Sequence, residues 1–313
     1  MKTEEEIQNS TSSPEATPHF DKSRAGHRDE GGDRSKSGLR EYAETIAVTI
    51  LAALFLKFFV IEAYHIPTAS MEDTLLAGDF LLVNKFIYGA KTPRYIPFTN
   101  VVLPFVTLPA VAKPKLGDVV VFEFPGGYGE GYDREVVNYV KRCIATPGDT
   151  LEIVDEAVYV NGQKIPLPPS AKFEKKFPKG ARDFTRGSAF NQDNYGPVIV
   201  PKSGQEIQLS ASNIEQWQKL IEREGHSVTE ESGNVRIDGV PVMSHTIQND
   251  YYFMMGDNRG NSLDSRFWGF VPEDLIIGKA MMVYWSWEES PGQRGIFGNW
   301  SSIRWNRIGT LVK

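Results

Sequence analysis

The stretch GDNRGNSLDSRFWG occupies residues 256–269. It joins glycine, acids, an amide, hydroxyl residues and arginine in one fixed order over fourteen residues. Taken alone, these residue types also suit a loop of exposed charges and turns. Chance is nevertheless a poor explanation for an ordered motif of this length, and two other segments of the chain carry residues that would complement it.

A second segment, residues 139–149, reads YVKRCIATPGD. A Lys-Arg pair usually lies on a solvated face, but here apolar residues flank Lys141 and Arg142 on both sides. Burial among apolar residues lowers the pKa of a lysine below its usual value of about 10.4. A lysine that is neutral near pH 7 can act as a base, so Lys141 is a candidate for that role.

A third segment, residues 66–71, reads IPTASM and contains Ser70. A serine that hydrolyses peptides needs a base, and the five histidines are scattered, with no obvious histidine–aspartate pairing to Ser70. Alone, Ser70 is best interpreted as a loop serine just beyond a helix. With Lys141 and the motif at residues 256–269 in the same chain, it indicates a serine–lysine hydrolase.

Together these segments closely resemble those of the type I signal peptidases, and residues 117–122, GDVVVF, resemble a structural strand of that family. The resemblance covers about residues 63–165 and 235–284. It implies a signal-peptidase-like β catalytic domain and a membrane-bound serine endopeptidase that cleaves N-terminal signal peptides from exported preproteins. It implies no cofactor, and no spacing of histidine, cysteine or acids typical of a metal site stands out.

The resemblance also carries roles over to single residues. Ser70 would be the nucleophile, and Lys141 would be the general base. The Thr68 hydroxyl and the backbone N–H of Ser70 would stabilise the negative charge that develops on the substrate oxygen. Ser262 would orient Lys141. A supporting polar network would be formed by Asp257, Asp264, Arg266 and Arg142.

The family's preference for small side chains at the first and third positions before the cut implies two shallow apolar pockets beside the serine. An extended substrate would pair with a strand edge there. The positions expected to contact it are Ile66, Pro67, Met71, Tyr139 and Val140. The chain departs from many members immediately afterwards, because Glu72 and Asp73 stand where others carry a more neutral or proline-containing stretch.

Residues 45–61 read TIAVTILAALFLKFFVI. A helix of some twenty residues is about 30 Å long and spans the hydrocarbon core of a membrane. We therefore predict a transmembrane helix over residues 39–63. A buried core helix is the alternative, because Lys57 interrupts the run, although a lysine near one end can reach the interface.

The flanks of this predicted helix set its orientation. Residues 1–38 contain almost no large apolar side chains, so we expect a disordered tail. Lys36 and Arg40 lie near one end and Glu62 near the other, and the positive-inside rule then leaves the tail in the cytoplasm. A catalytic domain at residues 64–313 would lie on the extracytoplasmic side of the cytoplasmic membrane, in contact with lipid and near the secretion translocon.

The remainder is predicted to be mostly β. One amphipathic helix is expected over residues 212–224, and Asn-Gly and Asp-Gly turns predict hairpins at 159–166 and 236–242. These hairpins would flank an inserted subdomain at about residues 167–233. The clearest strands are expected at residues 80–83, 118–124, 137–144, 157–160 and 280–285.

Composition and the N-terminal segments argue against several other classes of protein. A net charge of -6 argues against a nucleic-acid partner, because such proteins usually present a basic face to phosphates. The single cysteine excludes an internal disulfide. A self-cleaving repressor with a similar dyad would need a DNA-binding head, which an acidic tail and an apolar helix do not supply. A catalytically inactive, membrane-anchored β-rich binding or scaffold protein remains as the second hypothesis.

Overall fold

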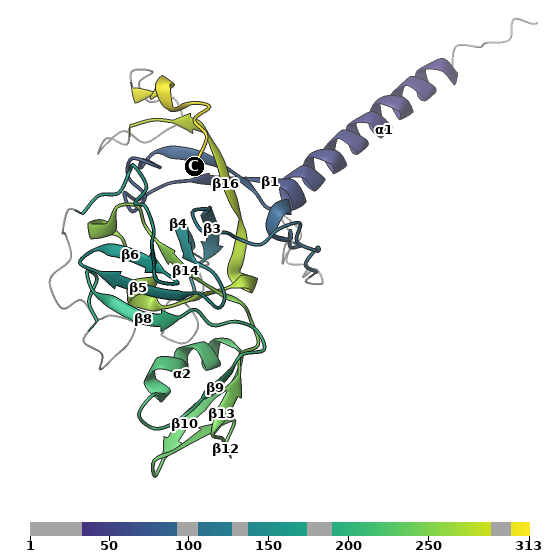
Figure 1. The fold of residues 1–313 in the computed structure, drawn as a ribbon. Helices are drawn as coiled ribbons and strands as arrows, with labels where there is room; N and C mark the ends of the chain where they lie inside the picture. The colour runs from purple at the N-terminus through teal and green to yellow at the C-terminus, as the bar shows by residue number, and fades with distance from the viewer. Residues whose placement is uncertain (1–32, 93–105, 127–136, 174–189, 289–301) are drawn as a thin grey trace, which may run out of the picture. The chain divides into compact units, whose positions relative to one another are not determined.

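The computed structural model describes residues 33–92, 106–126, 137–173, 190–288 and 302–313. The chain divides into two compact units, Met1–Leu51 and Ala52–Lys313, which are described separately (Figure 1). The first 32 residues of the predicted tail lie outside the described residues.

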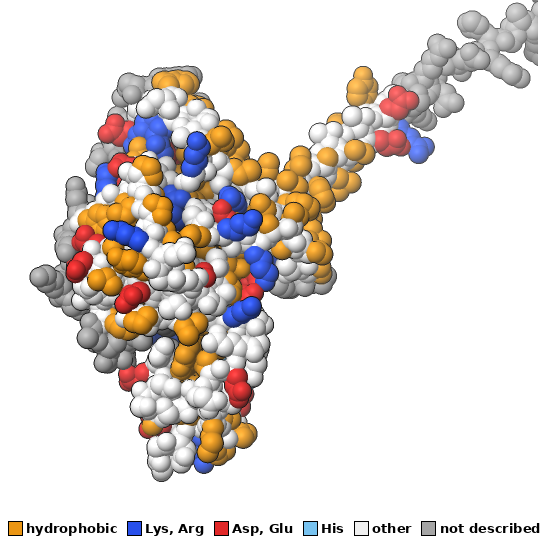
Figure 2. All heavy atoms as spheres, viewed as in Figure 1, with side chains coloured by type: hydrophobic (Ala, Val, Ile, Leu, Met, Phe, Trp, Pro, Cys, Tyr) orange, Lys and Arg blue, Asp and Glu red, His pale blue; other side chains and the backbone are white. Residues whose placement is uncertain are grey.

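One long helix, α1 (Asp33–Phe55), precedes the β-rich part, and a π-helical turn, η1 (Leu56–Val60), continues it. The stretch Arg40–Val60 is long and apolar enough to span a membrane, and apolar side chains cover it (Figure 2). None of its residues is buried, whereas a core helix would be enclosed. The apolar composition of this stretch therefore fits lipid better than a protein core.

The helix boundaries differ from those predicted. The helix begins at Asp33 rather than residue 39, so the last residues assigned to the tail are helical. Its helical course ends at Val60 rather than residue 63, because Ile61–His65 form a strand, β1. That strand pairs antiparallel with β2 (Asp79–Asn84), and its backbone groups are thus satisfied by a sheet instead of a helix.

The central sheet has seven strands in the order β1-β2-β16-β3-β4-β14-β15, and each described pairing is antiparallel. Its longest strand, β16, pairs with β2 along one part and with β3 along another. At Gly278 a Cβ atom would lie 2.4 Å from the Asn84 carbonyl oxygen, so only glycine allows this close pairing. The other strands of this sheet are β3 (Val119–Glu123), β4 (Asn138–Ala145), β14 (Tyr251–Met255), β15 (Val271–Pro272) and β16 (Ile276–Ser286).

A second sheet of four strands, in the order β7-β6-β5-β8, shares a hydrophobic core with β14. Aromatic rings from the two sheets meet there, with 5.5 Å between the ring centroids of Tyr195 and Phe253. This packing fixes β14, which leads directly into the motif at residues 256–269. The four strands are β5 (Thr150–Val154), β6 (Ala157–Val160), β7 (Gln163–Lys164) and β8 (Tyr195–Ile199).

A smaller lobe is built around α2 (Ile214–Arg223), whose Ile214, Leu220 and Ile221 are buried (Figure 1). The inserted subdomain predicted at residues 167–233 differs from this arrangement, because β8 joins the second sheet and the lobe extends past residue 233. Residues 174–189 of that insert lie outside the described residues. The strands of the lobe are β9 (Glu206–Gln208), β10 (Val228–Glu231), β11 (Asn234–Ile237), β12 (Val240–Pro241) and β13 (Ser244–Thr246).

The mostly β fold and the elements singled out from the sequence are confirmed. Strands occur at all five predicted places, and the predicted helix is α2. Both turn signals form hairpins, with β6 paired to β7 and β11 paired to β12. Short helical turns complete the fold: η2 (Phe86–Tyr88), η3 (Arg259–Asn261), α3 (Ser265–Trp268), η4 (Glu273–Leu275) and η6 (Trp305–Arg307).

Candidate active site

Ser70 lies in a tight turn between β1 and β2. The Glu72 N–H donates to the Ala69 carbonyl over 3.1 Å, and the Leu75 N–H donates to the Met71 carbonyl over 2.7 Å. Met71 and Leu75 are buried in the core and anchor the turn. Because these neighbours point inward, Ser70 is presented at the surface of the catalytic domain, where it remains partly exposed.

Lys141 on β4 reaches this serine. Its Nζ donates to Ser70 Oγ over 2.7 Å and to the Val140 carbonyl over 3.1 Å. Lys141 is only 4% exposed. The structure therefore brings together the two residues that the sequence singled out as nucleophile and base, although they are far apart in the chain.

The surroundings of Lys141 disfavour its charged form. Burial lowers the pKa of Lys141 to about 8, although the carboxylates of Asp264 and Asp257 partly oppose that change. The Tyr139 ring, with 5.2 Å from Nζ to the ring centroid, is a cation–π partner that likewise favours the charged form, so burial is what lowers the pKa. At neutral pH an appreciable fraction of Lys141 is thus neutral and able to accept a proton.

Arg142, the next residue on β4, holds the motif that follows β14. Its Nε and Nη2 donate to the two carboxylate oxygens of Asp257 over 2.8 and 2.7 Å, and its Nη1 donates to the Gly117 carbonyl over 2.7 Å. Burial by itself raises the pKa of Asp257, but the Arg142 guanidinium, together with the Thr74 hydroxyl and the charge of Arg259, lowers that pKa overall. Asp257 is therefore held as a carboxylate in a buried, two-point ion pair.

A second buried ion pair joins Asp264 and Arg266 within the motif. Arg266 donates from Nε and Nη2 to the carboxylate of Asp264 over 2.8 and 2.9 Å, and Nη2 also donates to the Arg259 carbonyl. Burial opposes ionisation of Asp264, yet Arg266 and the Gly256 N–H lower its pKa overall. Asp264 also caps α3 by accepting from the Arg266 backbone N–H.

Ser262 is buried beside Ser70. A Cβ atom added to Gly256 would lie 2.2 Å from Ser262 Oγ and 2.5 Å from the Ser70 carbonyl oxygen, so only glycine fits between them. The Ser262 hydroxyl lies close enough to Asp264 to help lower its pKa, without a hydrogen bond of ordinary geometry. In the part of the chain that the structure describes, Lys141 bonds Ser70 and Val140 rather than Ser262.

Thr68 and the expected substrate positions surround the pair. Thr68 Oγ1 lies 3.4 Å from Ser70 Oγ. Ile66 and Met71 are buried and pack with Val140 in one apolar cluster, whereas Pro67 is exposed. Tyr139 is partly buried beneath the Lys141 amine. All the predicted site residues thus lie on β4, in the motif at residues 256–269, or in the turn at residues 66–78. We name that turn the nucleophile turn, after the role predicted for Ser70.

The sequence reasoning missed several polar partners of the nucleophile turn. The Asn258 N–H donates to the Ser70 carbonyl over 3.1 Å, and its Nδ2 donates to the Ala69 carbonyl over 3.2 Å. Thr74 and Ser170 both donate hydroxyl hydrogens to Asp257. Asn258 stood in the quoted motif but had no role assigned, and Ser170 lies in the insert, where no signal pointed to it.

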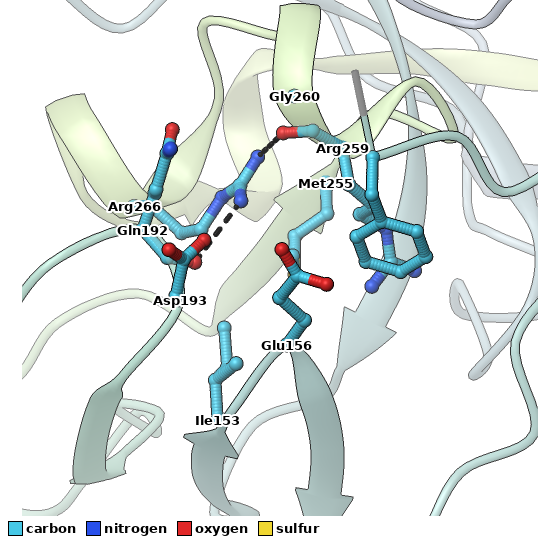
Figure 3. Close-up of a pocket in the computed structure, with 9 residues that line it drawn as sticks. Ile153, Glu156, Gln192, Asp193, Met255, Arg259, Gly260 and Arg266 are labelled. Atoms are coloured by element: carbon cyan, nitrogen blue, oxygen red, sulfur yellow. Dashed lines mark hydrogen bonds between the residues drawn. The ribbon is translucent and has the colours of Figure 1, made fainter. Parts of the chain in front are cut away.

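A small pocket is lined by residues that include Glu156, Arg259 and Arg266 (Figure 3). Its free volume is about 10 Å³, which is room for roughly one water molecule. Neither Ser70 nor Lys141 lines it. The pocket is therefore too small for a peptide and is separate from the Ser70–Lys141 pair.

Comparisons with known proteins indicate the family to which the chain belongs. The family model described as signal peptidase, peptidase S26, matches residues 39–285. The chain is 32% identical over 262 residues to signal peptidase I of Pseudomonas aeruginosa, covering 80% of this chain and 74% of that protein. It is 31% identical over 252 residues to signal peptidase I of Aquifex aeolicus, covering 79% and 85%. A solved signal peptidase I from Enterococcus faecalis V583 is 20% identical, with a TM-score of 0.26 over 54% of this chain and 97% of that one, a similarity too low to carry an argument.

Proposed function

The chain belongs to the signal peptidase family, peptidase S26, and is a serine endopeptidase that cleaves signal peptides; we propose that Ser70 is its nucleophile and Lys141 its general base. The observation that carries this proposal is the 2.7 Å hydrogen bond between Ser70 Oγ and the Nζ of a buried lysine. Neither the geometry nor the comparisons favour the inactive scaffold protein that the sequence left open.

The chemistry follows from these two groups. Neutral Lys141 accepts the Ser70 proton as Oγ attacks the scissile carbonyl carbon, and the resulting ammonium then protonates the leaving amine. Water activated by the same lysine hydrolyses the acyl-enzyme. The Thr68 hydroxyl and the Ser70 N–H donate to the oxyanion, a contribution of about 3 kcal/mol per donor in serine proteases.

The two buried ion pairs support the base through electrostatics. Asp257 and Asp264 alone would stabilise the ammonium form of Lys141 and raise its pKa. Arg142 and Arg266 pair with these carboxylates at close range, and burial is the largest influence on the pKa of the lysine. Gly256 fits between the Ser262 side chain and the Ser70 carbonyl, so Ser262 packs close to the turn that carries Ser70.

An extended substrate has a place to bind beside this pair. Strand β3 pairs with residues 138–142 of β4, whereas β14 pairs only from Arg142 onward. Among the described residues, one side of β4 at Tyr139 and Val140 is thus open for another strand. Ile66, Pro67 and Met71 would form the apolar walls that admit small substrate side chains.

The family and the apolar stretch Arg40–Val60 fit a membrane-anchored protein. We place the N-terminal tail in the cytoplasm and the catalytic domain, from Ile61 onward, outside the cytoplasmic membrane, against lipid and near the translocon. The charge bias of Lys36 and Arg40 supports this orientation.

Labelling with a membrane-impermeant maleimide in right-side-out vesicles tests the orientation. Native Cys143 is buried and should not react, so any label reports the introduced cysteine. Lys164→Cys, at an exposed position of the catalytic domain, should be labelled in intact vesicles. Ser23→Cys, in the N-terminal tail, should be labelled only after lysis. The reverse pattern would contradict the proposed orientation.

Cleavage of a purified preprotein in liposomes tests the dyad. The wild-type chain should cut after a small residue, and Ser70→Ala and Lys141→Ala should lose at least about a thousandfold in rate while remaining folded. Lys219→Ala, which changes an exposed lysine on α2, is the matched control. Undiminished cutting by either dyad variant would show that another pair carries the reaction.

A further inference from the structure

Two acids follow the nucleophile directly. Glu72 and Asp73 are partly to largely exposed, and Asp73 has a φ of 72°, a left-handed conformation that aspartate adopts more readily than most residues. The turn therefore places two negative charges beside the position where the substrate oxygen becomes negative. Without a neighbouring cation, they would repel each other and oppose that developing charge.

One lysine from a distant part of the chain meets both acids. Lys172 Nζ lies 3.1 Å from Asp73 Oδ1 and 3.6 Å from Glu72 Oε1. An isolated surface ion pair contributes about 1 kcal/mol or less to stability. Here, however, one cation serves two adjacent carboxylates, so its removal would leave like charges unbalanced within the nucleophile turn.

The backbone of Lys172 is fixed against the active-site motif. Its N–H donates to the Asp257 carbonyl over 3.1 Å, its carbonyl accepts from the Gly260 N–H over 3.3 Å, and it forms a parallel bridge with Asn258. Ser170, two residues earlier, contacts both Thr74 and Asp257 through its hydroxyl. Residues 170–172 therefore form a strap, defined by these contacts, between the motif and the nucleophile turn.

The contacts continue from Lys172 to Ser70. Glu72 Oε2 accepts from Asn258 Nδ2 over 3.0 Å, and that same Nδ2 donates to the Ala69 carbonyl. The Asn258 N–H donates to the Ser70 carbonyl. Lys172 thus holds Glu72, Glu72 holds the Asn258 amide, and Asn258 holds the backbone on both sides of the nucleophile.

We propose that Lys172 is a positioning residue for Ser70: it balances the acids at positions 72 and 73 and, through Glu72 and Asn258, fixes the backbone of the nucleophile. This inference rests on the proposed role of Ser70. A displacement of about 1 Å in a reacting group can lower a rate a hundredfold, so even a loosened turn has a measurable effect. Through residues 170–172, the predicted insert would thus contribute to catalysis, which its polar sequence did not indicate.

The test uses the full-length enzyme in detergent, with preprotein cleavage and Ser70 acylation by a small serine-directed probe as readouts. Lys172→Ala should lower both kcat and the acylation rate by about tenfold and leave KM within about twofold, because the geometry of Ser70 rather than substrate binding is changed. Lys172→Arg should retain most of the rate. Lys219→Ala, which removes an exposed lysine of α2, should behave like the wild type.

A charge exchange separates positioning from a general structural role. Asp73→Lys and Lys172→Asp should each slow acylation, and the double variant should be faster than Lys172→Asp alone, because it restores opposite charges at positions 73 and 172. The recovery should be partial, because the new carboxylate at position 172 still faces Glu72. An acylation rate of Lys172→Ala equal to that of Lys219→Ala would overturn the proposal. A rise in KM with unchanged probe acylation would also overturn it, by assigning Lys172 to substrate binding. If the wild type neither cleaves nor is labelled at Ser70, the proposed function itself fails instead.

Discussion

At the scale of single residues, Lys141 is a cation buried beside the hydroxyl that it is proposed to activate. Burial lowers its pKa to about 8, even though the nearby carboxylates of Asp264 and Asp257 favour the charged form and raise that pKa. Burial thus has two effects. It costs folding free energy because it disfavours the ammonium, and for the same reason it supplies the neutral amine that the reaction needs.

Replacing this lysine should stabilise the protein in a pH-dependent way. In the unfolded chain Lys141 titrates near 10.4, so below about pH 8 the folded state holds a charge at a cost of about 3 kcal/mol. That cost fades as the pH rises from about 8 to 10.4. Lys141→Met should therefore raise the free energy of unfolding by about 1 to 3 kcal/mol at pH 7 and by little at pH 10.5. Urea unfolding at both pH values measures this, with Ser70→Ala as control, and a Met variant no more stable at pH 7 would contradict it.

Some site residues were predictable and others were not. Ser70 and Lys141 followed from recognisable segments, and their hydrogen bond agrees with that expectation. Asn258 and Lys172 were missed because their roles depend on contacts between segments far apart in the sequence. A lysine in a polar insert has no local pattern that distinguishes it from a solvated surface residue.

At the scale of elements, the Arg142–Asp257 pair joins β4 to the motif that follows β14. Both residues are buried, and two parallel hydrogen bonds connect them. Lysine cannot reproduce this planar, two-point contact. Removing one partner of a buried pair costs about 3 to 5 kcal/mol, because the other charge is left without compensation.

We therefore expect Arg142→Lys to lower the free energy of unfolding by about 1 to 3 kcal/mol and the cleavage rate by at least about tenfold. Urea unfolding and preprotein cleavage measure the two effects. Arg236→Lys is the matched control, since Arg236 pairs with Glu231 over 3.1 Å at the surface, and it should change stability by less than about 0.5 kcal/mol. Equal behaviour of the two variants would mean that the buried pair is not structurally important.

Two strands, β14 and β1, were not indicated by the sequence, for different reasons. Tyr251–Met255, which forms β14, is buried at every position, so it lacks the alternation that marks a half-buried strand. Ile61–His65, which forms β1, follows the apolar helical run directly, with no proline or glycine between them to mark the end of the helix, and β1 then pairs with β2. Strands with alternating burial, such as β2 with its pattern of buried and half-buried residues, were predicted correctly.

At the scale of the whole catalytic domain, the C-terminal segment returns to the nucleophile turn. Arg307 donates from Nε to Asp79 Oδ1 over 3.0 Å and from Nη2 to the Thr74 carbonyl over 3.0 Å. Asp79 is fully buried, and its carboxylate also accepts from the Leu76 N–H. The last residues of the chain, which matched no family segment in the sequence, thus hold the far end of the turn that carries Ser70.

Arg307→Ala should destabilise the domain by about 1 to 3 kcal/mol, because the buried Asp79 carboxylate then keeps only the more distant Arg304 guanidinium, 4.0 Å away. Removing both charges with Arg307→Met and Asp79→Asn together should recover part of that loss. Thermal and urea unfolding follow the effect, and Lys313→Ala, at the exposed C-terminal residue, is the control. A loss of stability no larger than that of the control would contradict the proposed role of Arg307 in holding the turn.

The measurement that bears most directly on the Ser70–Lys141 dyad is the pH dependence of Ser70 acylation by a small serine-directed probe. With Lys141 as the base, the rate should rise with pH, level off with a midpoint near 8, and be abolished in Lys141→Met. A midpoint near 10.4 would show that the lysine is not buried in the working enzyme. A flat profile, or full acylation of the Lys141→Met variant, would show that Lys141 is not the base.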